Sequence, residues 1–339
     1  MELWFEARPE RMSKVRELCE IVEGADLPGI ALNEVKSPPD LVALSAFHEL
    51  RKATKVVTSI LVAFPRSPAV SALNAWHLQE FSKGRFELGL GTQVKGHIER
   101  RYGMEWLPPQ PRLREYIGAV RSVWDSWQTT SPLNVKGQYY NMNLVTPDFN
   151  PGPIDYAAPP IHTSGVNEAM CRLGGEISDG VIFAEPITKR WTDEVMLPAL
   201  DEGLAKSGRS RKDVVITGGG YVGVGETDDE VAKVRELIRY RIAFYSSTRT
   251  YLGPLKLEGF EDISQPLHKL SVTGRWDEMS KLVTDEILDR FAVIGRYDNV
   301  GDKLLARYGH FAQRVYVGPL FSQSITSRNL RKLADSIKQ

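Results

Sequence analysis

The stretch at residues 84–106, GRFELGLGTQVKGHIERRYGMEW, decides the fold that the sequence predicts. It opens with a Gly-Arg turn, continues as a short run at 86–90 in which large residues alternate with small or polar ones, and ends in a polar segment. Such alternation is typical of a β-strand. A strand that leads into a glycine turn and a polar loop is how α/β barrels present their chemistry, because ligands meet the carboxyl ends of the strands.

Gly89 and Gly91 in this stretch have two interpretations. A residue without a side chain lets a ligand approach the backbone closely. The alternative is that both glycines only relieve crowding where the strand passes beneath helices. A lone G-x-G pattern does not decide between the two.

Strand and helix patterns alternate along nearly the whole chain. The expected strands are eight short apolar runs, at residues 2–5, 29–32, 56–62, 85–90, 161–164, 180–183, 214–222 and 314–317. Eight such runs separated by helical patterns predict a (β/α)₈ TIM barrel. The main alternative is a doubly wound sheet, which has little support because no G-x-G-x-x-G lies between an early strand and a helix.

The alternation breaks at two places, which we interpret as insertions. Residues 97–160 contain a clear helix at 112–128 between segments rich in Pro and Gly, and residues 246–273 are irregular. No linker, internal repeat or low-complexity tract divides the chain. We therefore expect a single domain over residues 1–339, with the insertions forming a lid over the mouth of the barrel.

The composition excludes several classes of protein. Of the 339 residues, 43 are Lys or Arg and 43 are Asp or Glu, so the net charge is zero and indicates neither a nucleic-acid nor a membrane surface. The two cysteines and six histidines show no spacing typical of a metal site or a disulfide framework. The first residues do not resemble a signal peptide, and no apolar run approaches the roughly 20 residues of a membrane span. We expect a soluble cytoplasmic protein without a metal.

Several long blocks resemble the bacterial luciferase-like superfamily. They are the stretch at 84–106, PRLREYIGAVRSVWDSW at 111–127, MLPALDEGLAKSGRSR at 196–211 and GRWDEMSKLVTDEILDRFAVIG at 274–295. The resemblance covers nearly the whole chain and is greatest to the branch of F420-dependent oxidoreductases. It implies a barrel that holds an isoalloxazine-like ring at the carboxyl ends of its strands. It also implies a homodimer formed through the helices after strands two and three, including the helix at 68–81.

The resemblance implies a set of cofactor-binding residues at the strand ends. In deazaflavin-using relatives a non-proline cis peptide bulges against the ring, and the matching pair is Ser59-Ile60. Thr92 and His97 match positions that hydrogen-bond the ring or the ribityl chain. Phosphate is expected at the start of the helix after strand five, where backbone N–H groups attract anions. The expected cofactor-binding residues are Asn33, Ser59, Ile60, Thr92, His97, Ser164, Gly165, Val166 and Asn167.

Glu34 and His97 are the expected catalytic residues. Dehydrogenase relatives carry a histidine that transfers protons after strand two, where this chain has Glu34. A carboxyl group partly desolvated above an aromatic ring can act as an acid or base, and Lys36 is a candidate partner for Glu34. The alternatives are a solvated glutamate near a helix and a surface histidine.

The resemblance thus implies an F420-dependent oxidoreductase that transfers a hydride between the deazaflavin and a small organic substrate. Two alternatives remain open. The first is an FMN-dependent monooxygenase, because flavin-using members share the barrel. The second is a non-catalytic protein that binds a flavin or deazaflavin.

Overall fold

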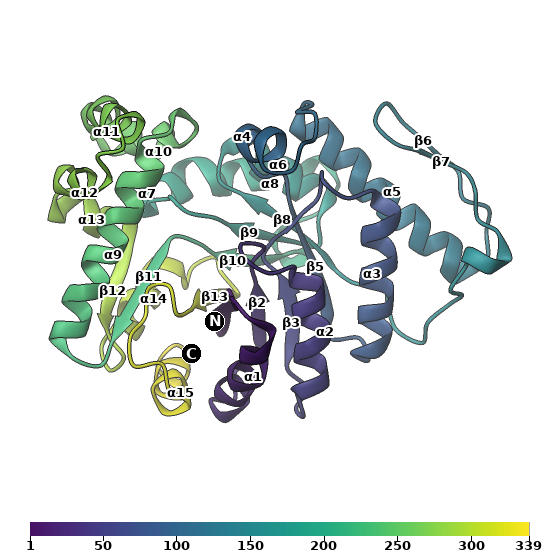
Figure 1. Cartoon of the computed structure of the whole chain (residues 1–339), viewed down its shortest axis with the longest axis horizontal. Coiled ribbons are helices and arrows are strands. Elements are labelled where there is room, and N and C mark those ends of the chain that lie inside the picture. Colours follow the sequence, from purple (N-terminus) through teal and green to yellow (C-terminus); the bar gives the residue numbers. More distant parts are fainter. Residues whose placement is uncertain (339) are drawn as a thin grey trace.

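A closed barrel of eight parallel strands forms the centre of the molecule (Figure 1). The computed structural model describes residues 1–338. Hydrogen bonds join the barrel strands in the order β1-β2-β3-β5-β8-β9-β10-β13, and β13 closes the ring on β1. Their bounds are β1 Glu2–Ala7, β2 Gly29–Leu32, β3 Lys55–Thr58, β5 Phe86–Gly91, β8 Ile161–Gly165, β9 Gly180–Phe183, β10 Val215–Gly218 and β13 Arg314–Val317. The predicted (β/α)₈ barrel is confirmed.

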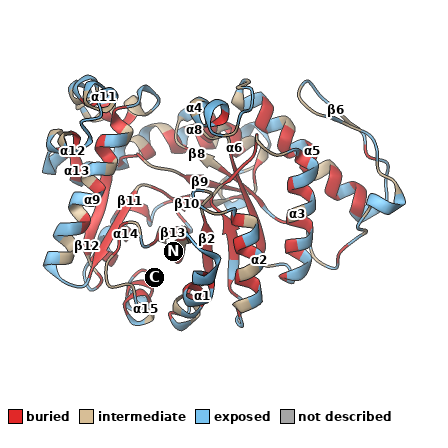
Figure 2. Cartoon of the chain, viewed as in Figure 1, coloured by how far each residue is buried: buried red, intermediate tan, exposed pale blue. Residues whose placement is uncertain are grey.

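Burial explains why these short runs form barrel strands. All residues of β2, β5 and β9 are buried, because one face of each strand fills the barrel and the other lies beneath helices (Figure 2). A parallel sheet covered on both faces requires near-continuous apolar runs, which is what the sequence provides. The short strand β4 (Leu61–Val62) continues the line of β3 and pairs with β5.

A ring of helices covers the barrel. The helices that follow successive barrel strands are α1 Val15–Gly24, α2 Pro39–Glu49, α3 Pro68–Phe81, α5 Pro109–Thr129, α6 Glu168–Ile177, α8 Leu197–Lys206, α14 Val300–Tyr308 and α15 Ser327–Ser336. Side chains fix where two of them begin. The Ser67 hydroxyl accepts a hydrogen bond from the Val70 N–H at the start of α3, and the Asn167 side chain accepts one from the Met170 N–H at the start of α6.

The first expected insertion is smaller than the sequence suggested. Helix α5 belongs to the ring, because its Trp124 stacks on Trp76 of α3 with ring centroids 6.3 Å apart and its Tyr116 hydroxyl lies 2.6 Å from that of Ser71. The added structure is the short helix α4 (Lys95–Arg100) and a hairpin of β6 (Val135–Lys136) and β7 (Asn141–Met142), which projects away from the body (Figure 1).

The second expected insertion is part of a larger side lobe, which we define as residues 221–296. It has a hydrophobic cluster of its own and lies at the left of Figure 1. Its strands β11 (Tyr221–Gly225) and β12 (Ala292–Arg296) pair in parallel, apart from the barrel. Its helices are α9 Asp228–Ser246, α10 Leu252–Glu258, α11 Ser264–Val272, α12 Trp276–Met279 and α13 Asp285–Phe291, and α7 (Lys189–Trp191) contacts α10.

The predicted strand at 214–222 is therefore wrong in one respect, since it is two strands. β10 stays in the barrel, the chain breaks at Gly219-Gly220, where Gly220 has a φ of +102°, and β11 leaves to pair with β12. A positive φ of this kind is accessible to glycine without a steric cost. The break places the side lobe next to the carboxyl ends of β9 and β10.

Candidate active site

A cavity of about 140 Å³ opens at the carboxyl ends of the barrel strands. Nearly every lining residue comes at or directly after the end of a strand, which is where barrels of this kind place their ligands. The polar or charged lining residues are Glu6, Arg8, Asn33, Ser59, Ser164, Glu185 and Tyr316, and the others are Ile60, Ile182, Phe183, Ala184, Gly218, Gly219, Gly220, Val222, Gly318 and Phe321.

Four residues predicted from the sequence line this cavity: Asn33, Ser59, Ile60 and Ser164. The Ser59-Ile60 peptide is cis, as the resemblance implied. The ends of β2 and β3 hold this segment, because the Ser59 N–H donates to the Leu32 carbonyl at 2.6 Å and the Asn33 amide donates to the Ser59 carbonyl at 2.5 Å. The Arg8 Nε in turn donates to Asn33 Oδ1 at 3.2 Å, so the three strand ends form one connected wall.

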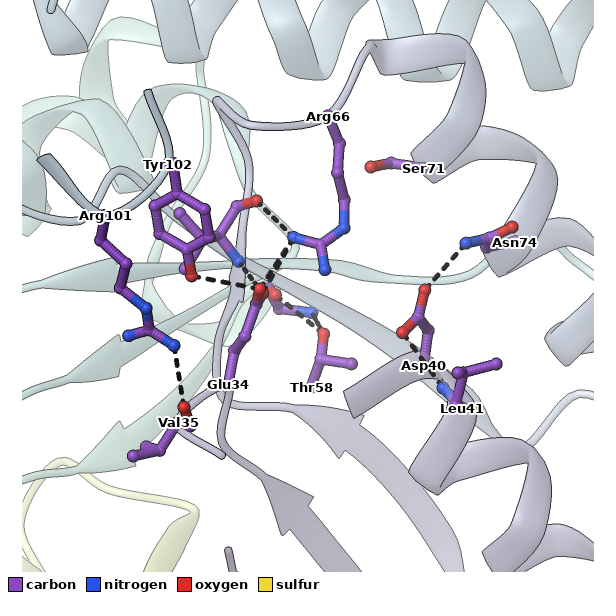
Figure 3. A network of polar contacts seen from close by, with 12 residues as sticks. Glu34, Val35, Asp40, Leu41, Thr58, Arg66, Ser71, Asn74, Arg101 and Tyr102 are labelled. Carbon is purple, nitrogen blue, oxygen red and sulfur yellow. Dashed lines mark hydrogen bonds and ion pairs between the residues drawn. The ribbon is translucent and has the colours of Figure 1, made fainter. Parts of the chain in front are cut away.

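Glu34 lies outside the lining and holds three loops together (Figure 3). Its carboxylate accepts hydrogen bonds from Arg66 Nη1 at 3.0 Å and from the Val62 N–H at 2.8 Å. The Tyr102 hydroxyl approaches it at 3.3 Å. The suggested pairing of Glu34 with Lys36 is wrong, because Lys36 makes an ion pair with Glu10 instead.

The other predicted residues lie around the rim rather than in the lining. Thr92 is half-buried and donates to the Gln93 carbonyl at 3.1 Å, and His97 is exposed on α4. Beyond Ser164 the chain turns into α6. Before the helix, the Val166 carbonyl accepts a hydrogen bond from Trp191 Nε1 at 3.3 Å, and Asn167 caps the helix. Gly165, Val166 and Asn167 thus continue from the cavity wall toward the start of the helix.

Two carboxyl groups and an arginine form the charged part of the lining. Arg8 Nη2 donates to Glu6 Oε1 at 3.0 Å, and both side chains are largely buried. Glu185 follows β9 in the same lining. Burial and the nearby charge of Glu6 raise its pKa to about 7, although the charges of Arg8 and Arg241 act in the opposite direction. A carboxyl group that is partly protonated near neutral pH is suited to exchanging protons with a ligand.

Comparison with known proteins identifies the family of this barrel. The model of the luciferase-like monooxygenases matches residues 6–314. The chain belongs to the luciferase-like monooxygenase family. It is 37% identical to an uncharacterised protein of Mycobacterium tuberculosis (strain ATCC 25618 / H37Rv) over 92% of this chain and 91% of the relative. It is also 28% identical to a putative coenzyme F420-dependent oxidoreductase of the same strain, over 84% of each chain.

Solved structures agree on the fold of this luciferase-like chain. The structure of coenzyme F420-dependent tetrahydromethanopterin reductase from Methanopyrus kandleri superposes with a TM-score of 0.80. The match covers 99% of this chain and 98% of the other, at 17% sequence identity. The relatives named by cofactor include F420-dependent enzymes, and the solved structures that share this barrel also include a Baeyer-Villiger monooxygenase in complex with FMN.

Sequence reasoning missed Glu6, Arg8, Glu185 and Tyr316 in the luciferase-like barrel. A signal was present, because each lies at or just after the carboxyl end of a predicted strand. Within residues 1–338 no three side chains of His, Cys, Asp or Glu come together as a metal site would require. Over the same described range, no helix has the length and apolar character needed to cross a membrane.

Proposed function

We propose that this protein is an F420-dependent oxidoreductase that transfers a hydride between the deazaflavin and a small organic substrate. The observation that carries the proposal is the wall of Asn33, Ser59 and Ile60 at the strand ends of a barrel that this chain shares with relatives named for F420. Ser164 continues that wall toward the start of α6.

The polar groups of the cavity fit a ring with carbonyl and N–H groups at one edge. The Asn33 side chain and the hydroxyls of Ser59 and Ser164 can each donate and accept hydrogen bonds. The Tyr316 hydroxyl is a buried atom of the same wall and lies close to the side chains of Ser59 and Thr217. Ligand pockets usually measure roughly 300–1,000 Å³. Since the cavity measures about 140 Å³, a tricyclic ring would have to extend beyond it.

F420, when bound, supplies or accepts two electrons as a hydride. The protein's own residues would hold and shield it. Ile60, Ile182 and Phe183 give the cavity an apolar wall that excludes water. The start of α6 would hold a phosphate, because Asn167 satisfies the N–H of Met170 and the remaining first N–H groups of the helix are available to an anion.

A titration with both cofactors tests the proposal. We expect F420 to bind with a change in its fluorescence, and FMN to bind at least tenfold more weakly. The family also contains monooxygenases, so the second candidate is an FMN-dependent monooxygenase. Binding of FMN without binding of F420, together with oxygen uptake when a flavin reductase supplies reduced FMN, would establish that alternative.

Glu34 and His97 stay predicted catalytic residues. For Glu34 to exchange a proton with a substrate, its ion pair with Arg66 would have to open. The variants Glu34→Gln and His97→Ala separate catalysis from binding. If neither variant changes turnover while F420 still binds, the acid–base assignment of Glu34 and His97 is wrong. If the wild-type protein binds F420 but no organic substrate oxidises or reduces the bound F420, a non-catalytic binding protein is the better description.

We also propose a homodimer formed through α2 and α3. Four large apolar side chains of these two helices are exposed: Leu41 (56%), Leu44 (45%), Val70 (49%) and Leu73 (41%). Neighbouring exposed apolar side chains on a soluble protein often mark an interface. We expect Leu44→Arg combined with Val70→Arg to convert a dimer into a monomer in sedimentation velocity. Leu237→Arg on α9, at a position exposed to the same degree as Leu44, should leave the dimer intact.

A further inference from the structure

Glu185 is the carboxyl group of the cavity that the protein leaves without a partner. It lies two residues after β9 and lines the cavity. No hydrogen bond or ion pair from residues 1–338 reaches its side chain, whereas Glu6 is paired with Arg8 and Glu34 with Arg66. An acidic side chain that lines a ligand cavity and has no protein partner is free to bond to a ligand.

The groups that face Glu185 come from both the barrel and the side lobe. The charged groups are Glu6 and Arg8 at the end of β1 and Arg241 on α9. Its charge also acts on four tyrosines: Tyr221 of β11, Tyr245 of α9, Tyr251 at the end of the turn Arg249–Tyr251, and Tyr308 of α14. Among the fixed charges, two arginines thus face the two carboxyl groups.

Buried polar atoms without partners lie on the lobe side of this cluster. Within residues 1–338 the Tyr221 hydroxyl and the Arg241 Nε have no hydrogen-bond partner. Arg241 uses Nη2 to donate to the Tyr245 hydroxyl at 3.2 Å and also lies over that ring. A buried donor without a partner costs free energy, roughly 1–3 kcal/mol, unless something else satisfies it. Neither residue lines the cavity, but both interact with the charge of Glu185, so polar groups without partners surround this carboxyl group on its lobe side.

The charges determine how readily Glu185 gives up a proton. Burial disfavours its carboxylate, and Glu6 adds repulsion, so the pKa rises to about 7. Arg8 and Arg241 act in the opposite direction and keep the carboxylate accessible near neutral pH. Both protonation states are therefore populated near neutral pH.

We propose that Glu185, rather than Glu34, is the catalytic acid and base of the hydride-transfer reaction; this assignment rests on the proposed function. In the direction of reduction, the substrate is a carbonyl or imine compound. Its carbon receives a hydride from the reduced deazaflavin, and the electron pair of the C=O or C=N bond moves to the heteroatom. That atom takes the proton of Glu185. The substrate would gain two hydrogens and the two electrons that reduced deazaflavin would supply, and the Glu185 carboxylate would recover its proton from water.

In the direction of oxidation, the Glu185 carboxylate takes the proton of an alcohol or amine as the hydride leaves its carbon. When Glu185 has passed this proton on to water, the positive charges of Arg8 and Arg241 offset the negative charge of its carboxylate. Asn33 accepts a hydrogen bond from Arg8 and donates one to the Ser59 carbonyl, so it connects Arg8 to the wall at Ser59. A proton donor and the expected seat of the ring therefore line one cavity.

An infrared titration of the cofactor-free protein tests the assignment without a substrate. In the wild-type protein we expect a carboxylic acid band that is lost as the pH rises, with a midpoint near pH 7. The band should be absent from Glu185→Gln and present in Glu34→Gln. Because the group lines an open cavity, the band should shift on mixing with D₂O. Glu6→Gln should lower the midpoint, since it removes a negative charge. A midpoint near that of an ordinary glutamate, or an unchanged band in Glu185→Gln, overturns the assignment.

A fluorescence titration with F420 separates this assignment from the proposed function. We expect Glu185→Gln to bind F420 within about twofold of the wild-type affinity. Loss of binding in Glu185→Gln, with Glu185→Asp binding normally, would make Glu185 a cofactor ligand and overturn its acid–base role. If the wild-type protein does not bind F420 while the band titrates near pH 7, the proposed reaction falls and Glu185 remains a proton-holding group of the cavity.

Discussion

Replacing Glu87 by alanine is expected to lower the free energy of unfolding by about 3–5 kcal/mol. Glu87 lies on β5 inside the barrel, and its carboxylate accepts two hydrogen bonds from Arg314 of β13, at 2.5 and 2.9 Å. His162 of β8 approaches it at 3.0 Å. All three side chains are buried. Alanine would leave the Arg314 charge in the barrel without its partner, which costs far more than an exposed ion pair contributes.

The effect of Glu87 should depend on pH. Burial alone would raise its pKa, but hydrogen bonds and charges from His162 and Arg314 outweigh burial and hold the pKa well below its usual value. An unfolded glutamate titrates near about 4.3. The stabilisation is therefore fully present above that value and is lost as the pH falls toward the folded pKa. The difference between wild type and Glu87→Ala should be largest at pH 7 and should shrink below about pH 4.

Urea denaturation of both proteins at pH 7 and at pH 3.5 measures this difference. Asp201→Ala is the matched control, because Asp201 also makes two hydrogen bonds with an arginine, at 2.6 and 2.7 Å to Arg211, but on the surface. We expect Asp201→Ala to lower the free energy of unfolding by less than about 1 kcal/mol. Equal effects of the two substitutions would mean that Glu87 contributes no more than a surface ion pair.

The barrel was predictable because each of its strands has a recognisable local sequence pattern. The runs at β2, β3 and β9 are short, apolar and flanked by turns, and both of their faces become buried. Strand β12 was missed because its apolar run follows helical residues without a break, as α13 ends at Phe291 and β12 begins at Ala292. Only pairing with β11, which lies far away in the sequence, distinguishes such a run from the end of a helix.

The wall of the cavity was predictable in part, for a related reason. Asn33, Ser59 and Ser164 each follow a recognisable strand, so that the barrel fold alone brings them together. The partner of Glu34 was not predictable from spacing. Lys36 lies two residues away in the sequence, yet Arg66 reaches Glu34 because β2 and β3 are neighbours in the barrel.

The charge of the cavity was the least predictable feature. Glu6 and Glu185 are ordinary glutamates in the sequence, and each alone is consistent with a solvated loop. Their interaction exists only because closure of the barrel brings the ends of β1 and β9 to one rim and the side lobe covers them. The pKa of Glu185 therefore belongs to the assembled fold and to no local segment.

Alanine at Gly91 is expected to weaken F420 binding at least tenfold, about 1.4 kcal/mol, with little change in stability. A Cβ atom at Gly91 would lie 2.5 Å from Ile60 Cδ1 and 2.6 Å from its Cγ1. Those are side-chain atoms that can rotate away, and Ile60 lines the cavity. The added methyl group would thus push the Ile60 side chain into the expected seat of the ring. Fluorescence titration with F420 measures the effect.

Gly89 gives the matched comparison, two residues earlier on the same strand. Its Cβ would lie 1.8 Å from the backbone carbonyl oxygen of Thr58 on β3, which no side-chain rotation relieves. The Thr58 hydroxyl also bonds to both the carbonyl and the N–H of Gly89, at 2.8 and 2.9 Å. Gly89→Ala should therefore force the strands apart and cost about 3 kcal/mol or more in stability. One glycine would serve the barrel and the other the cavity, and the crowding at Gly89 comes from the neighbouring strand β3 rather than from helices.

A double-substitution cycle tests whether Gly91 acts through Ile60. Ile60→Ala removes both clashing atoms and leaves Ile60 Cβ, at 3.5 Å, in ordinary contact with the new methyl group. In the Ile60→Ala background, Gly91→Ala should then cause no further loss of F420 affinity, because effects transmitted through a shared side chain are not additive. An equal loss of F420 affinity in both backgrounds would mean that Gly91 contacts the cofactor directly, through the backbone, and that Ile60 is not its intermediary.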